Sequence, residues 1–282
     1  MREPKQNWRW KAWIRAGCIG LVLFLFLLWT IVPILLVVST SFKVARDIFT
    51  VPPTLLFQPT LENYVRALTS GDFGRYFVNS VLVAVTSSLL ALTTGSLAAY
   101  SLAKLELPWA QTIADIILLG KLVPAITMLL PLFALLNLTG LLGTFVGPIL
   151  AHAAVNLPFV IWLLMGFIRD VPADLDSAAK IDGCSTMQVF WFIIRPAIFP
   201  GLVAATILSM QFSWNELLFS LQLTGLKTYT LPVGIAKFVG SISVDWGKSS
   251  AAATLTMVPI MILGFFIQGH LAKGTTGGAI KG

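Results

Sequence analysis

Long apolar runs constrain this chain more than any other feature of its sequence. A helix needs roughly 20 apolar residues to cross about 30 Å of hydrocarbon. Six runs approach or exceed that length, at 13–38, 81–103, 113–136, 141–167, 197–223 and 251–271. Only 11% of the residues are charged, against about 25% in soluble domains, so most of the surface must face lipid. Lipid cannot pair backbone groups, and the sequence therefore predicts an all-α polytopic membrane protein with six transmembrane helices.

Basic residues indicate on which side of the membrane the chain begins. Arg2, Lys5, Arg9 and Lys11 precede the first run, as in a signal peptide, but the run is too long and no small-residue cleavage site follows it. We expect an uncleaved first span and, with six spans, both termini in the cytoplasm. This orientation places 11 Lys and Arg inside and 7 outside, as the preference for cytoplasmic positive charge requires. The net charge of +7 is thus a topology signal, since no base-stacking motif suggests nucleic acid binding.

The one sizeable inward segment, residues 169–196, has the signals of a helix that ends at a corner. Pro172 suits a first helical turn, where its missing N–H costs nothing. Asp174 and Asp176 follow where carboxylates favour the positive end of the helix dipole. Gly183 is a natural stop because glycine accepts the left-handed backbone that ends many helices.

A second helix is expected directly after this corner. Ser185 and Gln188 match a capping box, and Pro196 and Pro200 should end or bend the helix as it meets the fifth run. A short cytoplasmic helix with small side chains can dock into a groove on another protein. The alternative is an amphipathic linker on the lipid headgroups, which would usually carry more Lys and Arg and fewer acidic residues.

The stretch DSAAKIDGCSTMQVFWFIIRPAIFP resembles the EAA loop of ABC importer permeases, E-A-A-x-x-D-G followed by a hydrophobic run and a proline. The motif positions are held by Ser177, Ala178, Ala179, Asp182, Gly183 and Pro196. Other segments resemble the carbohydrate branch of that family: NS at 79–80, AAYSLAK at the end of the second run, LPFVIWLL in the fourth, WNE at 214–216, TLPVG at 230–234 and DWG at 245–247. The likeness covers nearly the whole chain and points to the six-span, MalG-like second permease of maltose-type sugar importers.

The resemblance implies a type I ABC importer permease fold: an N-terminal segment (1–12), a transmembrane domain (13–273) with its coupling helix in the loop at 169–196, and a cytoplasmic tail (274–282). It implies a multi-pass permease of a bacterial or archaeal cytoplasmic (inner) membrane that carries a di- or oligosaccharide by alternating access. Its implied partners are a homologous second permease, two ATPase subunits, an extracytoplasmic solute-binding protein and membrane lipid. ATP and Mg²⁺ would bind those ATPases, and this chain itself would need no cofactor or metal.

One motif position departs from the family pattern. The family usually places Glu where this chain has Ser177, and Ser cannot make the charge-assisted contact to an ATPase cation, which is about twice as strong as a neutral one. Asp176 is a possible substitute, although it lies about 100° further around the helix. If the loop docks through its alanines, added bulk in an Ala179→Trp variant should uncouple transport.

Alternative functions leave this loop unexplained. ATP hydrolysis on the chain itself would need a P-loop, and the nearest match, GAIKG at 278–282, fails. A secondary transporter or channel usually shows paired buried charges or matched broken helices, and no broken pair is evident in the sequence. A membrane enzyme would cluster its catalytic groups at one depth, whereas the two histidines and the scattered carboxylates form no acid–base pair.

Polar residues within the apolar runs are candidates for the substrate pathway, because ionisable groups in a membrane are costly. They are Lys121, Trp214, Asn215 and Glu216. An aromatic ring beside polar groups suits a sugar. The alternatives are, for Glu216, a helix–helix hydrogen bond that holds the two permeases together and, for Lys121, a snorkelling side chain. Asp115 and His152 are expected to be structural or close to an interface.

Overall fold

The structure is a computed structural model that describes residues 6–69, 72–105, 107–237 and 245–276. Its helices are α1 (Gln6–Ser41), α2 (Ala45–Ile48), α3 (Glu62–Thr69), α4 (Phe73–Lys104), α5 (Ala110–Leu119), the 3₁₀ turn η1 (Gly120–Leu122), α6 (Ala125–Leu138), α7 (Val146–Arg169), α8 (Ala173–Ile181), α9 (Thr186–Val189), the π-helical turn η2 (Phe190–Ile194), α10 (Arg195–Ala197), α11 (Phe199–Asn215), α12 (Leu218–Leu223), α13 (Leu231–Ala236) and α14 (Trp246–Thr276). Throughout these described residues there is no β-strand, only an isolated bridge between Gly143 and Thr224. The all-α fold class is confirmed.

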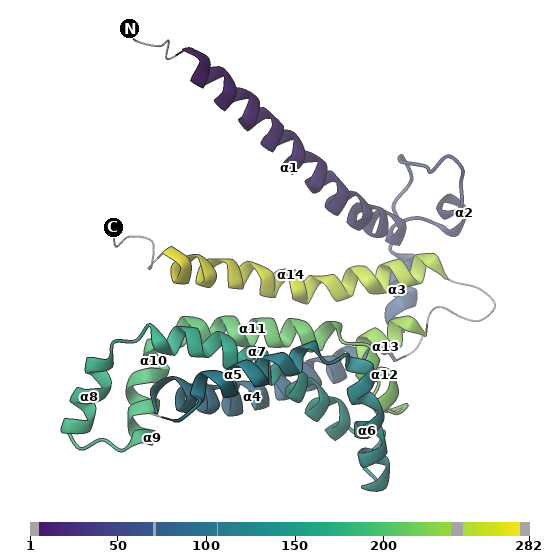
Figure 1. Cartoon of the computed structure of the whole chain (residues 1–282). Helices are drawn as coiled ribbons and strands as arrows, with labels where there is room; N and C mark the ends of the chain where they lie inside the picture. The colour runs from purple at the N-terminus through teal and green to yellow at the C-terminus, as the bar shows by residue number, and fades with distance from the viewer. Residues whose placement is uncertain (1–5, 70–71, 106, 238–244, 277–282) are drawn as a thin grey trace. The chain divides into compact units, whose positions relative to one another are not determined.

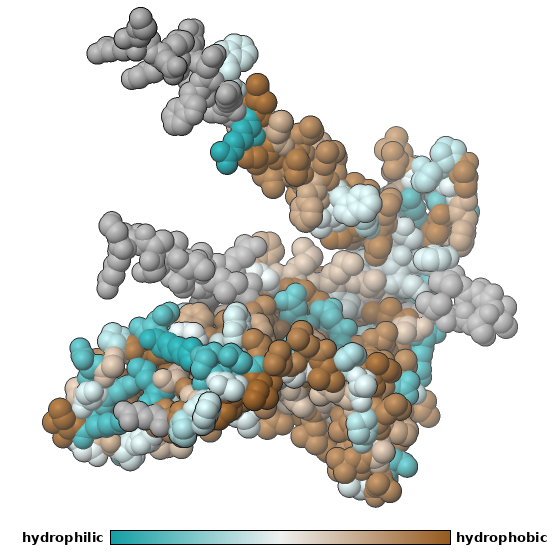
Figure 2. All heavy atoms as spheres, viewed as in Figure 1, coloured by the Kyte–Doolittle hydropathy of each residue, from teal (hydrophilic) through white to brown (hydrophobic). Residues whose placement is uncertain are grey.

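The chain divides into two compact units, Met1–Ser70 with Phe238–Leu255, and Gly71–Lys237 with Thr256–Gly282. In the first unit, the most apolar window of α1, within Trp13–Ser41, has a mean hydropathy of 3.0. Most of the coloured surface along this helix is hydrophobic (Figure 2). A surface this apolar needs a covering of lipid or protein.

The second unit is built on α4, α7 and α11, which pack side by side (Figure 1). The helices approach closely where glycine faces a neighbour: a Cβ on Gly95 of α4 would lie 2.7 Å from Val160 Cγ1 of α7. The short helices α8 and α9 lie at one end of this bundle, and α6, α12 and α13 lie at the other (Figure 1). The two ends of the bundle therefore present different short helices to their surroundings.

Four helices are long and apolar enough to cross a membrane, and two further spans exist only if each of two sharply bent helix pairs counts as one. The predicted third span, 113–136, is wrong as a single helix, because Ala110–Leu122 and Ala125–Leu138 meet at 91°. Pro124 causes this break: it lacks an N–H and forces the preceding Val123 into an extended conformation (ψ 124°).

The predicted fifth span, 197–223, is also wrong as a single helix. α11 ends at Asn215, Glu216 is extended (φ −75°, ψ 120°), and α12 begins two residues later. The fourth span starts five residues later than expected, at Val146, because Gly143 is in the left-handed region (φ +78°). The described chain therefore contains broken helices, although no matched pair of broken segments was evident in the sequence.

Candidate functional site

The α8 corner, residues 172–189, forms through the local interactions that its sequence predicts. α8 starts at Ala173, directly after Pro172, and carries Asp174 and Asp176 in its first turn. Gly183 follows the helix with φ +87°, a conformation that costs other residues about 1–2 kcal/mol. Helix, stop and corner lie where we expected them.

The second helix of the corner has its predicted cap and its predicted bend. The Ser185 hydroxyl accepts a hydrogen bond from the Gln188 N–H, and the Gln188 side chain accepts one from the Ser185 N–H, which completes the capping box. Pro196 lies just before an 80° bend between Thr186–Ala197 and Phe199–Asn215. This proline shapes the connection and is not part of α8.

An ion pair fastens α8 to the last turn of α4. Lys104 Nζ lies 2.9 Å from Asp176 Oδ2, and the two side chains are only 11% and 14% exposed. Lys104 also donates to the Val171 carbonyl at 2.8 Å. The Tyr100 hydroxyl, one turn earlier, contacts the Thr186 carbonyl at 3.4 Å. The AAYSLAK segment thus contacts both helices of the corner, α8 and α9. The sequence pattern did not predict this role.

The buried face of α8 includes the alanine that we expected to dock outside. Ala179 is only 4% exposed and packs in a core with Val189, Phe190 and Ile194. Bulk at Ala179 would therefore disrupt the corner itself, so uncoupling by Ala179→Trp could not report on docking. Asp176 was considered as a stand-in for the missing Glu in the contact with an ATPase cation. Its carboxylate is instead paired with Lys104 inside the corner.

The opposite face of α8 is open. Asp174, Ser177, Ala178 and Ile181 are exposed and follow the i, i+3, i+4, i+7 spacing of one helix face. Ile181 is 86% exposed, although a large apolar side chain gains about 1.5–3 kcal/mol from burial. The Ser177 hydroxyl donates to the Ala173 carbonyl at 3.2 Å, and no second hydrogen bond joins it to the described part of the chain. We call these four residues the α8 outer face; the exposed Asp182 and Gly183 continue it into the corner.

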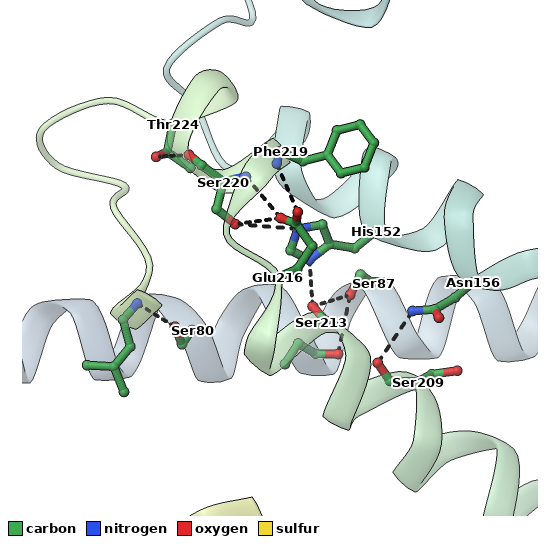
Figure 3. Close-up of polar contacts among 12 residues, drawn as sticks. Ser80, Ser87, His152, Asn156, Ser209, Ser213, Glu216, Phe219, Ser220 and Thr224 are labelled. Carbon is green, nitrogen blue, oxygen red and sulfur yellow. Dashed lines mark hydrogen bonds and ion pairs between the residues drawn. The ribbon is translucent and has the colours of Figure 1, made fainter. Parts of the chain in front are cut away.

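Glu216 lies where α11 breaks, and it holds the break together (Figure 3). Its two carboxylate oxygens accept hydrogen bonds from the first turn of α12, from the N–H groups of Phe219 at 3.0 Å and Ser220 at 3.1 Å. Its Oε2 also lies 3.0 Å from Nε2 of His152 on α7. A carboxylate beside the start of a helix satisfies N–H groups that have no partner within that helix.

His152 extends this network to α4. Its ring is fully buried, and its Nδ1 lies 2.6 Å from the Ser213 hydroxyl, which in turn accepts from the Ser87 hydroxyl at 3.1 Å. A neutral ring with its proton on Nε2 satisfies every contact, since Ser213 then donates to Nδ1 and Nε2 donates to Glu216. The network joins α4, α7, α11 and α12 of this one chain, which supports a structural role for His152 and shows that Glu216 braces helices within the chain.

Two of the four pathway candidates remain accessible. Lys121, at the break between α5 and α6, is exposed; its Nζ lies 3.0 Å from the Val155 carbonyl and 4.8 Å from the Phe212 ring centroid. Asn215 is exposed on α11, one turn after the exposed Gln211, whose carbonyl accepts its amide hydrogen bond. Sequence reasoning missed Gln211, although its spacing of four residues from Asn215 was a usable signal.

Trp214 points the other way, into the bundle. It is 5% exposed, its ring packs edge-on against Phe77 with 5.5 Å between centroids, and its Nε1 donates to the Thr256 carbonyl at 3.3 Å. The structure therefore separates Trp214 from the exposed polar positions. Among the described residues, no group of three or more His, Cys, Asp or Glu side chains could hold a metal ion.

Comparison with known proteins places these features in a family. A family model described as "Binding-protein-dependent transport system inner membrane component" matches residues 91–277, more than half of the chain. The trehalose transport system permease protein SugB of Mycobacterium tuberculosis (strain CDC 1551 / Oshkosh) is 36% identical over 261 residues, 90% of this chain and 93% of that protein. The diacetylchitobiose uptake system permease protein NgcG of Streptomyces coelicolor (strain ATCC BAA-471 / A3(2) / M145) is 34% identical over 263 residues, 91% and 87% of the two chains.

A solved structure shares the fold. It is a bacterial ABC transporter involved in the import of the acidic polysaccharide alginate, with a TM-score of 0.76, 20% identity, and coverage of 95% of this chain and 99% of that one. Together with the relatives, the family match confirms the expected multi-pass permease, and it identifies a transport subunit rather than an enzyme. The chain belongs to the family of inner membrane components of binding-protein-dependent transport systems, the permease subunits of ABC importers.

Proposed function

We propose that this chain is the permease through which an ATP-driven importer passes a carbohydrate, most simply a di- or oligosaccharide. Two relatives that match about 90% of its length are named for trehalose and for diacetylchitobiose, and a further one, 32% identical, is named for trehalose and maltose. The sugars in these names contain two or more units. A further relative, 33% identical, is named for sulfoquinovosyl glycerol, so the chemistry that these names share is a hydroxyl-rich solute.

The chain works within a larger complex in this proposal. It pairs with a homologous second permease, and an extracytoplasmic solute-binding protein delivers the sugar. Two ATPase subunits bind ATP and Mg²⁺ in the cytoplasm. Both termini lie in the cytoplasm, so the transmembrane domain (13–273) is flanked by an inner N-terminal segment (1–12) and an inner tail (274–282). The count of basic residues, 11 inside and 7 outside, supports this orientation.

The α8 outer face is the docking surface for one ATPase. Its centre is Ile181, whose 86% exposure leaves an apolar side chain free to enter a groove, with Ala178 beside it to permit close approach. Ser177 replaces the usual Glu, so this dock relies on apolar contact more than on an ion pair. Asp176 and Ala179 hold the corner from behind, Gly183 and Pro196 shape it, and Asp182 extends the outer face beside Gly183.

Force applied to α8 reaches the bundle through α4. The Lys104–Asp176 ion pair and the packed face of Ala179 join the corner to the core helices, so α8 cannot move far without them. When nucleotide draws the ATPases together, the bundle shifts from inward-open to outward-open, a two-state change that nucleotide biases. Lys121 and Asn215 face the sugar, while Glu216 braces the break in α11.

The observation that carries this proposal is the open α8 outer face on a corner that is otherwise latched to the bundle. The test is ATP-driven sugar uptake into proteoliposomes by the complex encoded with its neighbouring reading frames. Ile181→Ser should lower uptake by about tenfold or more, because burial of an Ile is worth about 1.5–3 kcal/mol. Leu175→Ser, about 120° around the same helix, is the matched control and should leave uptake nearly unchanged. Uptake without ATP, or equal loss in both variants, would overturn the proposal.

A further inference from the structure

An apolar groove runs between α4 and α11 near the end of the bundle that carries the α8 corner. Its volume is about 370 Å³, within the range of pockets that hold small ligands. Leucine and branched side chains of the two helices make most of its wall, including Leu89, Leu92, Leu202 and Val203. The groove therefore suits a hydrocarbon chain better than a sugar.

The few hydroxyl groups in the groove do not alter this character. Thr93 donates to the Leu89 carbonyl at 2.8 Å, and Thr206 donates to the Leu202 carbonyl at 2.7 Å, each one turn back in its own helix. Ser96 does the same toward Thr93 at 3.1 Å. Their hydrogens are already in use, so the wall offers a ligand no free hydroxyl donor.

One charge lies on the groove, and it is positive. Arg195 is exposed and lines the groove beside Trp191, with its guanidinium carbon 4.8 Å from the centroid of the Trp191 ring. Among the residues that the structure describes, no carboxylate pairs with Arg195. A cation without a counter-ion at the mouth of an apolar groove calls for a ligand with an anionic head and an apolar tail.

The position along the bundle agrees with a lipid. Phe192 and Phe199 are 73% and 60% exposed on either side of Arg195, and aromatic side chains gather at the level of the lipid headgroups. Basic pockets between transmembrane helices on the cytoplasmic side bind anionic phospholipid heads. The cytoplasmic side assigned here rests on the proposed orientation, whereas binding itself does not.

We propose that this groove binds one anionic phospholipid, with its phosphate on the Arg195 guanidinium and an acyl chain between α4 and α11. The site lies where α10 bends into α11, behind the α8 corner. A lipid there would fill the space beside the bend from outside the bundle. The competing occupant is a helix of the second permease, which would need a carboxylate opposite Arg195.

The test is native mass spectrometry of the purified complex with added phosphatidylglycerol or phosphatidylcholine of identical acyl chains. We expect phosphatidylglycerol to bind with a clear preference. Arg195→Gln should weaken its binding about tenfold or more, since a hydrogen bond to a charged group is lost, and should abolish the preference. Lys180→Gln, an exposed basic residue of α8, is the matched control and should change neither. Val203→Trp should fill the groove and reduce binding of both lipids.

Several outcomes would overturn the proposal. Equal binding of both lipids by the unaltered complex, or an unchanged preference in Arg195→Gln, would show that the guanidinium does not hold a phosphate. A helix of the second permease seen in the groove by electron cryomicroscopy of the complex would assign the site to protein. The lipid proposal does not predict a loss of ATP-driven uptake. If lipid binding is disproved, the proposed transport function is therefore unaffected.

Discussion

Removal of the Lys104 ammonium should release the α8 corner from the end of α4. Lys104→Met keeps much of the side-chain volume but leaves the Asp176 carboxylate buried without its cation. One oxygen of that carboxylate, Oδ1, already has no hydrogen-bond partner among the described residues, and Oδ2 would lose its contact at 2.9 Å. Asp176→Ala leaves the Lys104 ammonium, which keeps the Val171 carbonyl at 2.8 Å. The two single variants should therefore differ.

The size of each effect follows from burial. Breaking a buried pair costs about 3–5 kcal/mol, and the 11% and 14% exposure of these side chains favours the lower end. We expect about 3 kcal/mol for Lys104→Met and about 2 kcal/mol for Asp176→Ala, which retains one partner for its remaining charge. The double variant buries no charge and should cost only about 1 kcal/mol, because replacing both partners is often nearly neutral.

Thiol labelling measures this opening directly. Ala179→Cys, in a chain whose Cys18 and Cys184 are replaced by Ser, places a small reporter at a position that is 4% exposed. Each 1.4 kcal/mol is a factor of ten in the open population, so labelling should rise about 100-fold with Lys104→Met and about 30-fold with Asp176→Ala.

The double variant decides whether the pair is coupled. It should raise labelling only about fivefold, as expected for side chains that interact directly. If its effect equals the product of the single effects, or if no variant changes the labelling rate, the Lys104–Asp176 ion pair does not hold the corner closed. A cysteine at the exposed Ala178 in each background is the control for reagent access and should react at one rate throughout.

Three further substitutions test the close contacts of the second unit. Gly183→Ala should open the same corner by about 1–2 kcal/mol, because its φ of +87° strains a side chain, and the labelling assay reads this as roughly a tenfold rise. Gly201→Val should lower the yield of folded protein, since a Cβ at Gly201 would lie 2.6 Å from the Phe167 ring; Phe167→Ala should restore part of that yield, and no restoration would count against the contact. His152→Phe should lower the thermal unfolding midpoint by more than His152→Gln does, because only the amide can still hydrogen-bond to Glu216; equal losses would contradict the network.

Local chemistry made the α8 corner predictable. Glycine at a left-handed position, carboxylates in a first turn and a Ser–Gln capping box each act within a few residues, so the sequence contains the whole cause. Gly183, Ser185 and Gln188 are accordingly placed as expected. The resemblance to ABC importer permeases rested on the same segment, and the family match confirms it.

The packing of the corner was beyond local reasoning. α8 has nine residues, and its small side chains do not indicate which face turns inward. That choice depends on α4, whose Lys104 lies 72 residues before Asp176 in the chain and 2.9 Å from it in space. Local reasoning therefore did not show that Ala179 faces inward, and it overlooked Ile181, which is 86% exposed on the outer face.

One break in the apolar runs could be predicted from the sequence, and another could not. Pro124 after Val123 was a usable signal for the first break, whereas Glu216 became a helix break only through His152 and the N–H groups of α12. Because the structure has two sharply bent pairs, continuity of the helices is no argument against a secondary transporter. Family membership is the finding that favours the ABC importer permease.

Photo-crosslinking from the α8 outer face tests the central claim most directly. A photoreactive amino acid replaces Ile181 in the complete transporter, with the same substitution at Leu175 as the control on the same helix. The account predicts an adduct between position 181 and a nucleotide-binding subunit, identified by mass spectrometry, and little or none from position 175. If position 181 of an actively transporting complex yields adducts with lipid alone, α8 does not dock the ATPase and the account is wrong.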